Sequence, residues 1–285
     1  MNHFATTRLL VAALAAGALT MTQAPPAAAQ SPPAPGAAKI TGQNLTFTAG
    51  QGVSNNVVIS RSGPFNIIDD IARINPGPGC KWFDPNNRTK VRCLFGPLGR
   101  VVVLAGDRAD IVTANISAPV RIVGGEGDDQ LTGGSNTDQL LGQNGHDKLH
   151  GNGARDFFWL GLGNDEAHGG PGNDVMDAEG GDDRVYGGPG ADHLYGWTGH
   201  DQLHGQSGDD YLAGGTGKDR VDGGPDKDTL HGDGSDDVVN GGPGNDELFG
   251  ESGHDQLNGA DGTDFADGGT GTDTCSAEQQ LNCNP

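Results

Sequence analysis

The sequence has 285 residues, of which 51 are glycine, and 38 acidic against 17 basic residues give a formal net charge of −21. Hydrophobic residues make up 33% and aromatic residues 5%, too few for a conventional core in a chain of this length. An acidic surface repels phosphate, which disfavours nucleic acid as a partner and favours a divalent cation. Composition alone is typical of a disordered acidic chain, whereas acids repeated at a fixed spacing indicate metal binding.

Residues 1–29 have the three parts of a secretory signal peptide. A short basic segment (1–8) precedes an apolar run (9–19) that is too short to span a bilayer, and Ala27-Ala28-Ala29 offers a small-residue cleavage site. An uncleaved anchor is the alternative. Residues 30–38 (QSPPAPGAA) are interpreted as a Pro/Ala linker, and no later segment is apolar enough to predict a membrane span.

Residues 39–123 are predicted to form a separate β-rich unit. Short runs of strand-forming residues alternate with Gly, Pro and Asn turns, and we expect strands at 44–48, 56–61, 65–69, 90–95, 100–105 and 120–123. The segment Gly106-Asp107-Arg108-Ala109-Asp110 resembles a degenerate copy of the loops that follow it. We therefore expect this unit to cap the next domain, with an independent sugar- or peptide-binding domain as the alternative.

Residues 124–276 divide into seventeen nine-residue repeats without an insertion or deletion. Position 1 is Gly in fifteen repeats, position 4 is Gly in thirteen, and position 8 is Leu, Val, Met or Phe in fourteen. Position 6 is Asp in every repeat, and these residues are Asp129, Asp138, Asp147, Asp156, Asp165, Asp174, Asp183, Asp192, Asp201, Asp210, Asp219, Asp228, Asp237, Asp246, Asp255, Asp264 and Asp273. Disordered low-complexity sequence does not hold its acids in such a phase.

This pattern resembles the repeats-in-toxin (RTX, hemolysin-type) calcium-binding family, whose consensus is Gly-Gly-x-Gly-x-Asp-x-apolar-x. The resemblance covers just over half of the chain. It implies an all-β protein in which two repeats form one turn of a right-handed parallel β-roll, with positions 1–6 as a loop and positions 7–9 as a short strand. It also implies that several Ca²⁺ ions lie between loops on the same side, held by the seventeen position-6 aspartates and by backbone carbonyls.

Physical chemistry supports the same interpretation. Glycine at positions 1, 2 and 4 permits left-handed backbone and close approach of carbonyl oxygens to an ion. Stacked strands lie about 4.8 Å apart, so Asp192 and Asp210 of successive turns repel each other unless a cation lies between them. Calcium needs more oxygen ligands than one loop supplies, and the sparse core suggests that calcium binding is coupled to folding.

Some loops match the consensus better than others, which predicts a ranking of sites. Asn136, Ala154, Asp226 and Ser235 replace the position-4 glycine. The uninterrupted runs predict the tightest ions between Asp192 and Asp210, Asp201 and Asp219, Asp246 and Asp264, and Asp255 and Asp273.

The four cysteines form two local pairs, Cys80 with Cys93 and Cys275 with Cys283. Each pair is expected to close a small disulfide loop in an oxidising compartment, and the second would tie down a C-terminal cap at residues 277–285. Zinc is the competing interpretation for four cysteines, but neither pair has metal-ligand spacing.

Neither the His-Glu-x-x-His nor the Gly-x-Ser-x-Gly motif occurs, and no cysteine is placed as a nucleophile, so we do not expect an enzyme. The main prediction is a secreted, extracellular calcium-binding protein that serves as a structural or interaction module. A calcium-dependent adhesin that binds glycans or the cell envelope is the second hypothesis, and a secreted calcium-dependent hydrolase is the third.

Positions 7 and 9 should point outward, with odd repeats on one sheet and even repeats on the other. The odd sheet carries charged and histidine side chains, whereas the even sheet carries six aromatic residues. An exposed aromatic patch suits sugar rings or a second copy of the roll, so Phe157, Trp159, Tyr195 and Tyr211 are the candidate contact residues. Coverage of this sheet by the N-terminal unit is the alternative.

Overall fold

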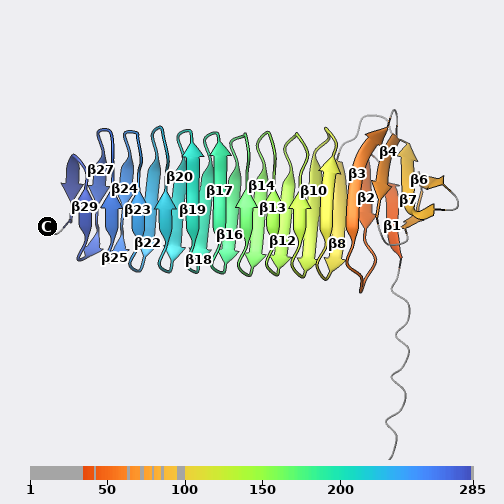
Figure 1. Ribbon diagram of the computed structural model, residues 1–285, viewed down its shortest axis with the longest axis horizontal. Coiled ribbons are helices and arrows are strands. Elements are labelled where there is room, and N and C mark those ends of the chain that lie inside the picture. Colours follow the sequence, from red (N-terminus) through yellow and green to blue (C-terminus); the bar gives the residue numbers. More distant parts are fainter. Residues whose placement is uncertain are drawn as a thin grey trace, which may run out of the picture. The chain divides into compact units, whose positions relative to one another are not determined.

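The computed structural model describes residues 35–41, 43–62, 65–70, 74–78, 80–84, 87–94 and 100–283. The predicted signal peptide, residues 1–29, lies outside the described residues. The described chain from residue 35 onward belongs to one compact unit, a parallel β-solenoid without helices among these residues (Figure 1). The predicted all-β fold and the β-roll are confirmed.

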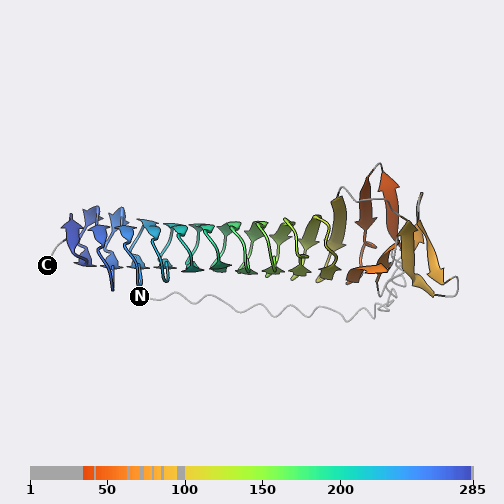
Figure 2. The ribbon, with the colours of Figure 1, turned by 90° about the horizontal axis from the view of Figure 1, so that it is seen from above.

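Two sheets form the walls of the solenoid, and within the repeats the chain passes back and forth between them (Figure 2). The first sheet, which we call the even sheet, holds the strands of the even repeats. Its main path, starting from the N-terminal end, is β5 (Ile74–Pro76), β1 (Gly36–Thr41), β2 (Asn44–Thr48), β8 (Arg100–Asp107), β10 (Val120–Glu126), β12 (Gln139–Asn144), β14 (Phe157–Leu162), β16 (Val175–Gly180), β18 (His193–Thr198), β20 (Tyr211–Thr216), β22 (Thr229–Gly234), β24 (Glu247–Phe249), β27 (Phe265–Asp267) and β30 (Gln279–Leu281). Two short strands, β25 (Ser252–Gly253) and β28 (Thr270–Gly271), pair with each other, and β25 also pairs with β22.

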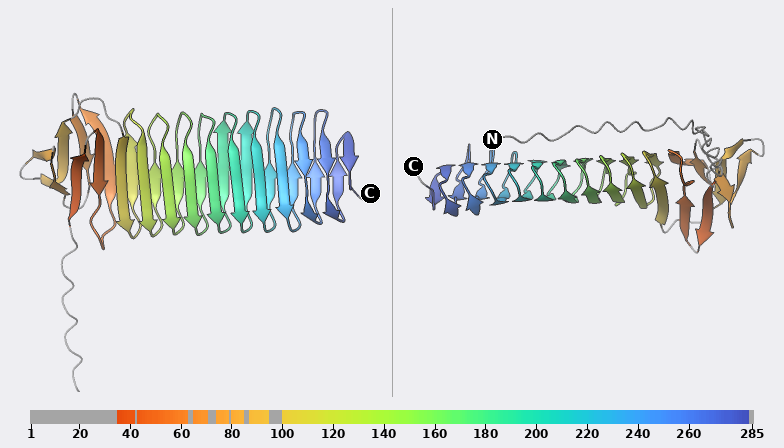
Figure 3. Two further views of the ribbon diagram at one scale, coloured as in Figure 1. Left: turned by 180° about the vertical axis from the view of Figure 1, so that it is seen from behind. Right: turned by 90° about the horizontal axis from the view of Figure 1, so that it is seen from below.

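The second sheet, the odd sheet, holds the strands of the odd repeats. Its order is β6 (Cys80–Asp84), β7 (Asn87–Leu94), β4 (Phe65–Asp69), β3 (Asn56–Ser62), β9 (Ile111–Asn115), β11 (Gln130–Thr132), β13 (Lys148–His150), β15 (Glu166–His168), β17 (Arg184–Pro189), β19 (Gln202–Ser207), β21 (Arg220–Asp222), β23 (Val238–Asn240), β26 (Gln256–Asn258) and β29 (Thr274–Ser276). Figure 3 shows the same stack of strands from behind and from below.

Within the repeats, successive strands of each sheet pair in parallel with residues eighteen positions apart, for example Gln139 with Phe157. One turn therefore contains two repeats, as predicted. Because the side-chain direction alternates along a strand, position 8 points inward and positions 7 and 9 point outward. Position 8 is at most 2% exposed from Leu131 through Ala266, and these side chains form one continuous core between the sheets.

The outer faces carry stacked side chains, as the alternation predicts. On the odd sheet His150, His168, Tyr186 and His204 stack with ring centroids 4.6–5.0 Å apart. Lys148 pairs with Glu166 there at 3.1 Å. On the even sheet, rings from His193 through Tyr211 to Phe265 contact one another across successive strands. Both faces are thus lined by side-chain ladders.

The segment before the repeats continues both sheets. Strands are confirmed at each of the six places where the sequence predicts them, with bounds that differ by up to a few residues. The strands β1, β5, β6 and β9 are additional. The last residues assigned to the linker, 36–38, lie in β1, because β1 forms an antiparallel hairpin with β2 that supplies partners for its backbone groups. Parallel pairing of β2 with β8 and of β3 with β9 joins this segment to the roll.

Both predicted disulfides are present. Cys80 and Cys93 face each other across the β6–β7 pair, with Cα atoms 4.1 Å apart. Cys275 on β29 bonds to Cys283 just after β30, with Cα atoms 5.8 Å apart. Since β30 pairs with β27, the C-terminal segment adds a further strand to the even sheet, and the disulfide holds that strand against the last odd strand.

The two disulfides allow a matched test of end-fraying. Replacing Cys275 and Cys283 by Ser should accelerate amide hydrogen exchange in β27, β29 and β30. Closing a loop of this size is worth about 2–3 kcal/mol by chain-entropy estimates. The control replaces Cys80 and Cys93 by Ser, which should leave exchange at the C-terminus unchanged. Equal exchange in the two variants would contradict the stapling role of the C-terminal disulfide.

Candidate metal centre

The position-6 aspartates form two rows, one along each edge of the solenoid where the loops turn. Each residue ends a Gly-rich loop and directly precedes a strand. The side chains are buried, since none of the seventeen is more than 3% exposed. Parallel stacking places each of them one turn from the next in its row, eighteen residues along the chain. The structure therefore brings together the aspartates that the sequence predicts as neighbours.

One carboxylate oxygen of each aspartate is used by the backbone. The N–H of Asp192 donates to Oδ1 of Asp210 at 2.7 Å, and the N–H of Asp201 donates to Oδ1 of Asp219 at 2.8 Å. The same contact repeats from turn to turn along both rows. These hydrogen bonds fix the side-chain orientation, so that the second oxygen of each carboxylate has a defined direction.

The second oxygen, Oδ2, is buried without a hydrogen-bond partner in sixteen of the seventeen aspartates. In the loops that have glycine at position 1, Oδ2 lies against that glycine, and in most of them a carbonyl of the loop one turn further on lies close by, whereas Leu160 and Ala178 occupy position 1 in the loops of Asp165 and Asp183. A methyl group placed on Gly205 would lie 2.3 Å from Oδ2 of Asp210 and 2.7 Å from the carbonyl oxygen of Gly223. Glycine at position 1 thus leaves room for two oxygens to converge.

Burial opposes ionisation of most of these carboxyl groups. Loss of solvation raises the pKa of Asp156, Asp183, Asp228 and Asp237 from 3.8 to about 8, against the effect of the backbone hydrogen bond. Neighbouring aspartates of the same row raise the pKa of each of these four further. A row of buried carboxylates that repel one another is stable at neutral pH only if their charge is compensated.

The oxygen set fits a hard dication such as calcium. Calcium takes six to eight oxygen ligands, and carboxylates and backbone carbonyls are its usual donors. Within the described part of the chain no three Asp, Glu, His or Cys side chains cluster as a metal site. The position-6 aspartates would therefore hold calcium together with loop carbonyls, and the ion would supply the positive charge that the buried Oδ2 atoms lack.

Asp138 departs from this arrangement. The N–H of Gly134 donates to its Oδ2 at 2.5 Å, so both of its carboxylate oxygens have backbone partners. Among the residues that replace the position-4 glycine, Ala154, Asp226 and Ser235 keep a left-handed φ of 72°, 88° and 96°, whereas Asn136 does not. In the loop of Asp138 a backbone N–H therefore occupies the second carboxylate oxygen, and the other three altered loops keep a positive φ at position 4.

The rows extend beyond the repeats at both ends. Asp110 is 1% exposed, its N–H donates to Oδ1 of Asp129, and burial raises its pKa to about 6. Its Oδ2 is unpaired, which makes it a further ligand candidate. The sequence showed its degenerate loop, but one extra residue between this loop and the repeats hid the match to position 6. At the other end, Oε2 of Glu278 accepts the N–H of Asp264 at 2.9 Å, so a glutamate takes the place of the next aspartate.

The pKa shifts predict how the calcium-free protein responds to pH. Because the folded-state pKa values lie above 3.8, the folded chain binds more protons than the unfolded chain between about pH 4 and pH 8. The calcium-free roll should therefore lose stability as pH rises through this window. Circular dichroism in calcium-free buffer should show more β-structure at about pH 6 than at about pH 8.5. A β-signal that is unchanged or larger at the higher pH would contradict the shifts.

The two kinds of loop predict different effects of the same substitution. Asp210→Asn keeps an oxygen for the N–H of Asp192 but removes the charge that would bind calcium, so the calcium midpoint of folding should rise severalfold. Asp138→Asn should raise it less, because both oxygens of Asp138 already accept backbone hydrogen bonds. Calcium titrations of both variants, followed by circular dichroism, measure the difference. Equal shifts would show that the Asp138 loop also binds an ion. The ranking of the other sites stays a prediction.

Comparison with known families agrees with this geometry. The family model described as RTX calcium-binding nonapeptide repeat matches six stretches, some of them overlapping, at residues 121–149, 132–167, 168–203, 204–239, 213–248 and 240–275. Together they cover just over half of the chain. No curated protein matches the sequence. The chain belongs to the RTX calcium-binding nonapeptide-repeat family and is a calcium-binding repeat protein.

Proposed function

We propose that this protein is secreted, folds around several Ca²⁺ ions in the extracellular medium and then serves as a rigid structural or interaction module. The observation that carries the proposal is the pair of aspartate rows, in which sixteen buried Oδ2 atoms lack a partner. A cation that binds only the folded chain stabilises it by mass action. Many weak sites along one solenoid make folding depend steeply on calcium concentration.

Secretion is supported by the signal-peptide pattern of residues 1–29 and by two disulfides, which persist in oxidising compartments. Among the described residues, no helix is long and apolar enough to cross a bilayer. A chain that stays unfolded where calcium is scarce suits export before folding, because the ions are then supplied outside the cell.

We propose a binding role without catalysis. The sequence has none of the common hydrolase motifs, and its repeated histidines have structural neighbours. His150, His168 and His204 stack in one ladder with Tyr186, and Nδ1 of His146 accepts the N–H of Asn164. These contacts give the histidines a packing function in the roll.

An adhesin that binds glycans, or another copy of the roll, is the second candidate. Its support is the even sheet, where two groups of half-buried aromatic side chains lie on the outer face. Phe157 and Trp159 lie side by side with ring centroids 6.4 Å apart, and Tyr195 and Tyr211 contact each other at 5.8 Å. The strand β16 separates the two groups, so they are two smaller surfaces instead of one continuous patch.

Limited proteolysis tests the calcium-dependent module. The mature protein should be cut throughout the repeats in excess chelator, and a fragment that contains the repeats should resist cleavage in millimolar calcium. Magnesium should not protect, because it requires a small octahedral site that carbonyl-rich loops do not form. Equal resistance with chelator and with calcium would contradict the proposal.

The N-terminus of the natural protein tests secretion. Protein recovered from the medium of the cells that make it should begin close to residue 30, after the Ala27-Ala28-Ala29 segment. N-terminal sequencing and intact mass measure this. A full-length chain retained inside the cells would contradict secretion.

A further inference from the structure

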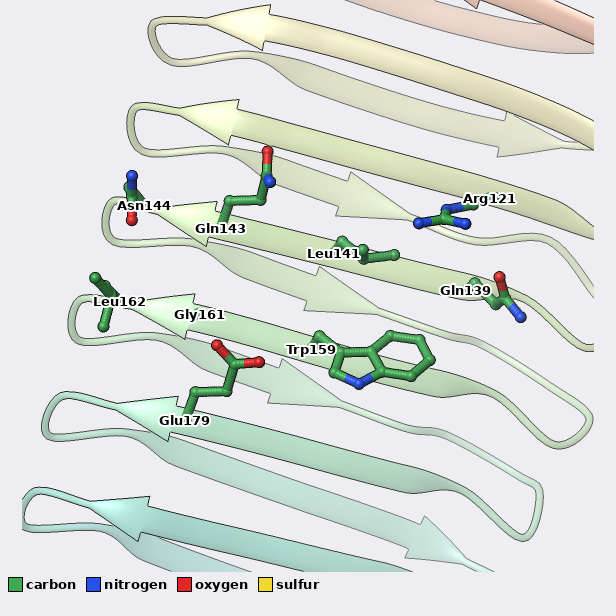
Figure 4. A pocket seen from close by; sticks show the side chains of 9 residues that line it. All are labelled: Arg121, Gln139, Leu141, Gln143, Asn144, Trp159, Gly161, Leu162 and Glu179. Atoms are coloured by element: carbon green, nitrogen blue, oxygen red, sulfur yellow. The ribbon is translucent and has the colours of Figure 1, made fainter.

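The outer face of the even sheet has a hollow of about 620 Å³ over β10, β12, β14 and β16. Ligand sites of small molecules have typical volumes of about 300–1,000 Å³. Figure 4 shows Arg121, Gln139 and Trp159 toward one end of the strands, Gln143 and Glu179 toward the other, and Leu141 between them. The hollow is therefore a mixed polar and aromatic site on an otherwise regular sheet.

The hollow exists because a glycine interrupts a column of side chains. Pairing aligns Gln143, Gly161 and Glu179 on successive strands. Gly161 has a φ of 110°, and a Cβ atom there would lie 1.9 Å from the carbonyl oxygen of Gln143, so no larger residue fits. The side chains on either side of Gly161 thus become the walls of a gap.

An aromatic ring forms one side of this gap. Figure 4 shows the indole of Trp159 with its ring face turned toward the viewer, who looks onto the sheet from solvent. The neighbouring ring of Phe157 is nearly parallel to it, at 15°, and the Arg155 guanidinium lies 5.0 Å above Phe157. One face of Phe157 is therefore covered by a cation, and Trp159, which is half-buried, is the ring that lines the hollow.

The polar side chains around the ring retain unused hydrogen-bonding groups. Oε1 of Gln139 accepts from Arg100 at 3.3 Å, which leaves the amide N–H groups of Gln139 as donors. Asn144 donates to Glu126 at 2.8 Å, which leaves its carbonyl oxygen as an acceptor. The hollow thus offers donors and acceptors beside an open ring face.

These features distinguish between classes of ligand. A peptide that binds by strand addition needs a free sheet edge, but β12 and β14 pair with neighbours on both sides. Nucleic acid is repelled by a chain with a net charge of −21 and by Glu179 at this site. An apolar ligand would leave the amides and charges unpaired. A saccharide matches both the polar groups and the aromatic ring of the hollow. Its hydroxyls donate and accept hydrogen bonds, and its C–H face packs on the ring.

We propose that this hollow binds a saccharide chain, with one sugar ring on Trp159 and its hydroxyls on Gln139, Gln143 and Glu179. Arg121 lies where it would pair with an acidic substituent of the sugar. The inference rests on the proposed calcium-dependent fold, because the site takes side chains from four strands that only the stacked roll brings together. Saccharide binding should therefore lower the calcium concentration needed for folding.

Calorimetric titration of the mature protein in millimolar calcium tests the site with two probes, neutral cellotetraose and acidic tetragalacturonate. At least one should bind, and its identity reports the charge of the natural sugar. Trp159→Ala should weaken that binding about tenfold or more, the equivalent of one lost ring contact. The matched control is Trp197→Ala, which removes an indole from β18 outside the hollow and should leave the affinity unchanged.

The outcomes separate the site from the fold. The side chains of Trp159 and Trp197 both point outward, so both variants should keep the wild-type calcium midpoint of folding in circular dichroism. A loss of sugar binding in Trp159→Ala alone therefore supports the site. Failure of both probes to bind wild type, or equal losses in the two variants, would overturn it. If wild type binds a probe equally well in excess chelator, the calcium-dependent fold is wrong and the saccharide site stands.

Discussion

The turns of this solenoid bury two rows of carboxylates, and every position-6 aspartate except Asp138 has one oxygen that the protein does not satisfy. The first oxygen accepts a backbone N–H of the preceding turn, as Asp210 does from Asp192. The second oxygen lies beside a glycine and a carbonyl, where it gains nothing from the protein. An unpaired buried charge is among the most costly features that a fold can contain. The rest of the architecture is arranged so that a cation can remove this cost.

The nine-residue repeat meets several requirements at once. Position 6 supplies the charged carboxylate, and glycine at position 1 leaves room for that carboxylate. Position 8 contributes one layer of side chains from each sheet to the core. Two repeats return the chain to the same edge, so that every charge faces its copy from the next turn. The same stacking aligns the outward positions, which generates the ring ladder of His150 to His204 and the hollow beside Trp159.

The repeat, together with its resemblance to the RTX family, predicted the solenoid, its two-repeat turn and the alignment of the aspartates, because a strict period places equivalent residues of successive turns side by side. The features that the sequence did not predict are those set by local backbone geometry. Asp110 and Glu278 join the rows through turns of a different length, and Asp138 is closed by the N–H of Gly134, which no residue type reveals. The hollow was also hidden, because Gln143 and Glu179 belong to odd repeats but lie on strands of the even sheet.

Calcium titration of the mature chain by far-ultraviolet circular dichroism, starting from excess chelator at neutral pH, tests the central claim most directly. The two rows of unsatisfied carboxylates predict a largely unfolded spectrum without calcium. A cooperative rise of the β-signal should follow at about 10⁻⁴–10⁻³ M, the range of extracellular calcium modules. A β-rich spectrum that excess chelator leaves unchanged would show that the protein tolerates its buried carboxylates without the ion, and would contradict the account.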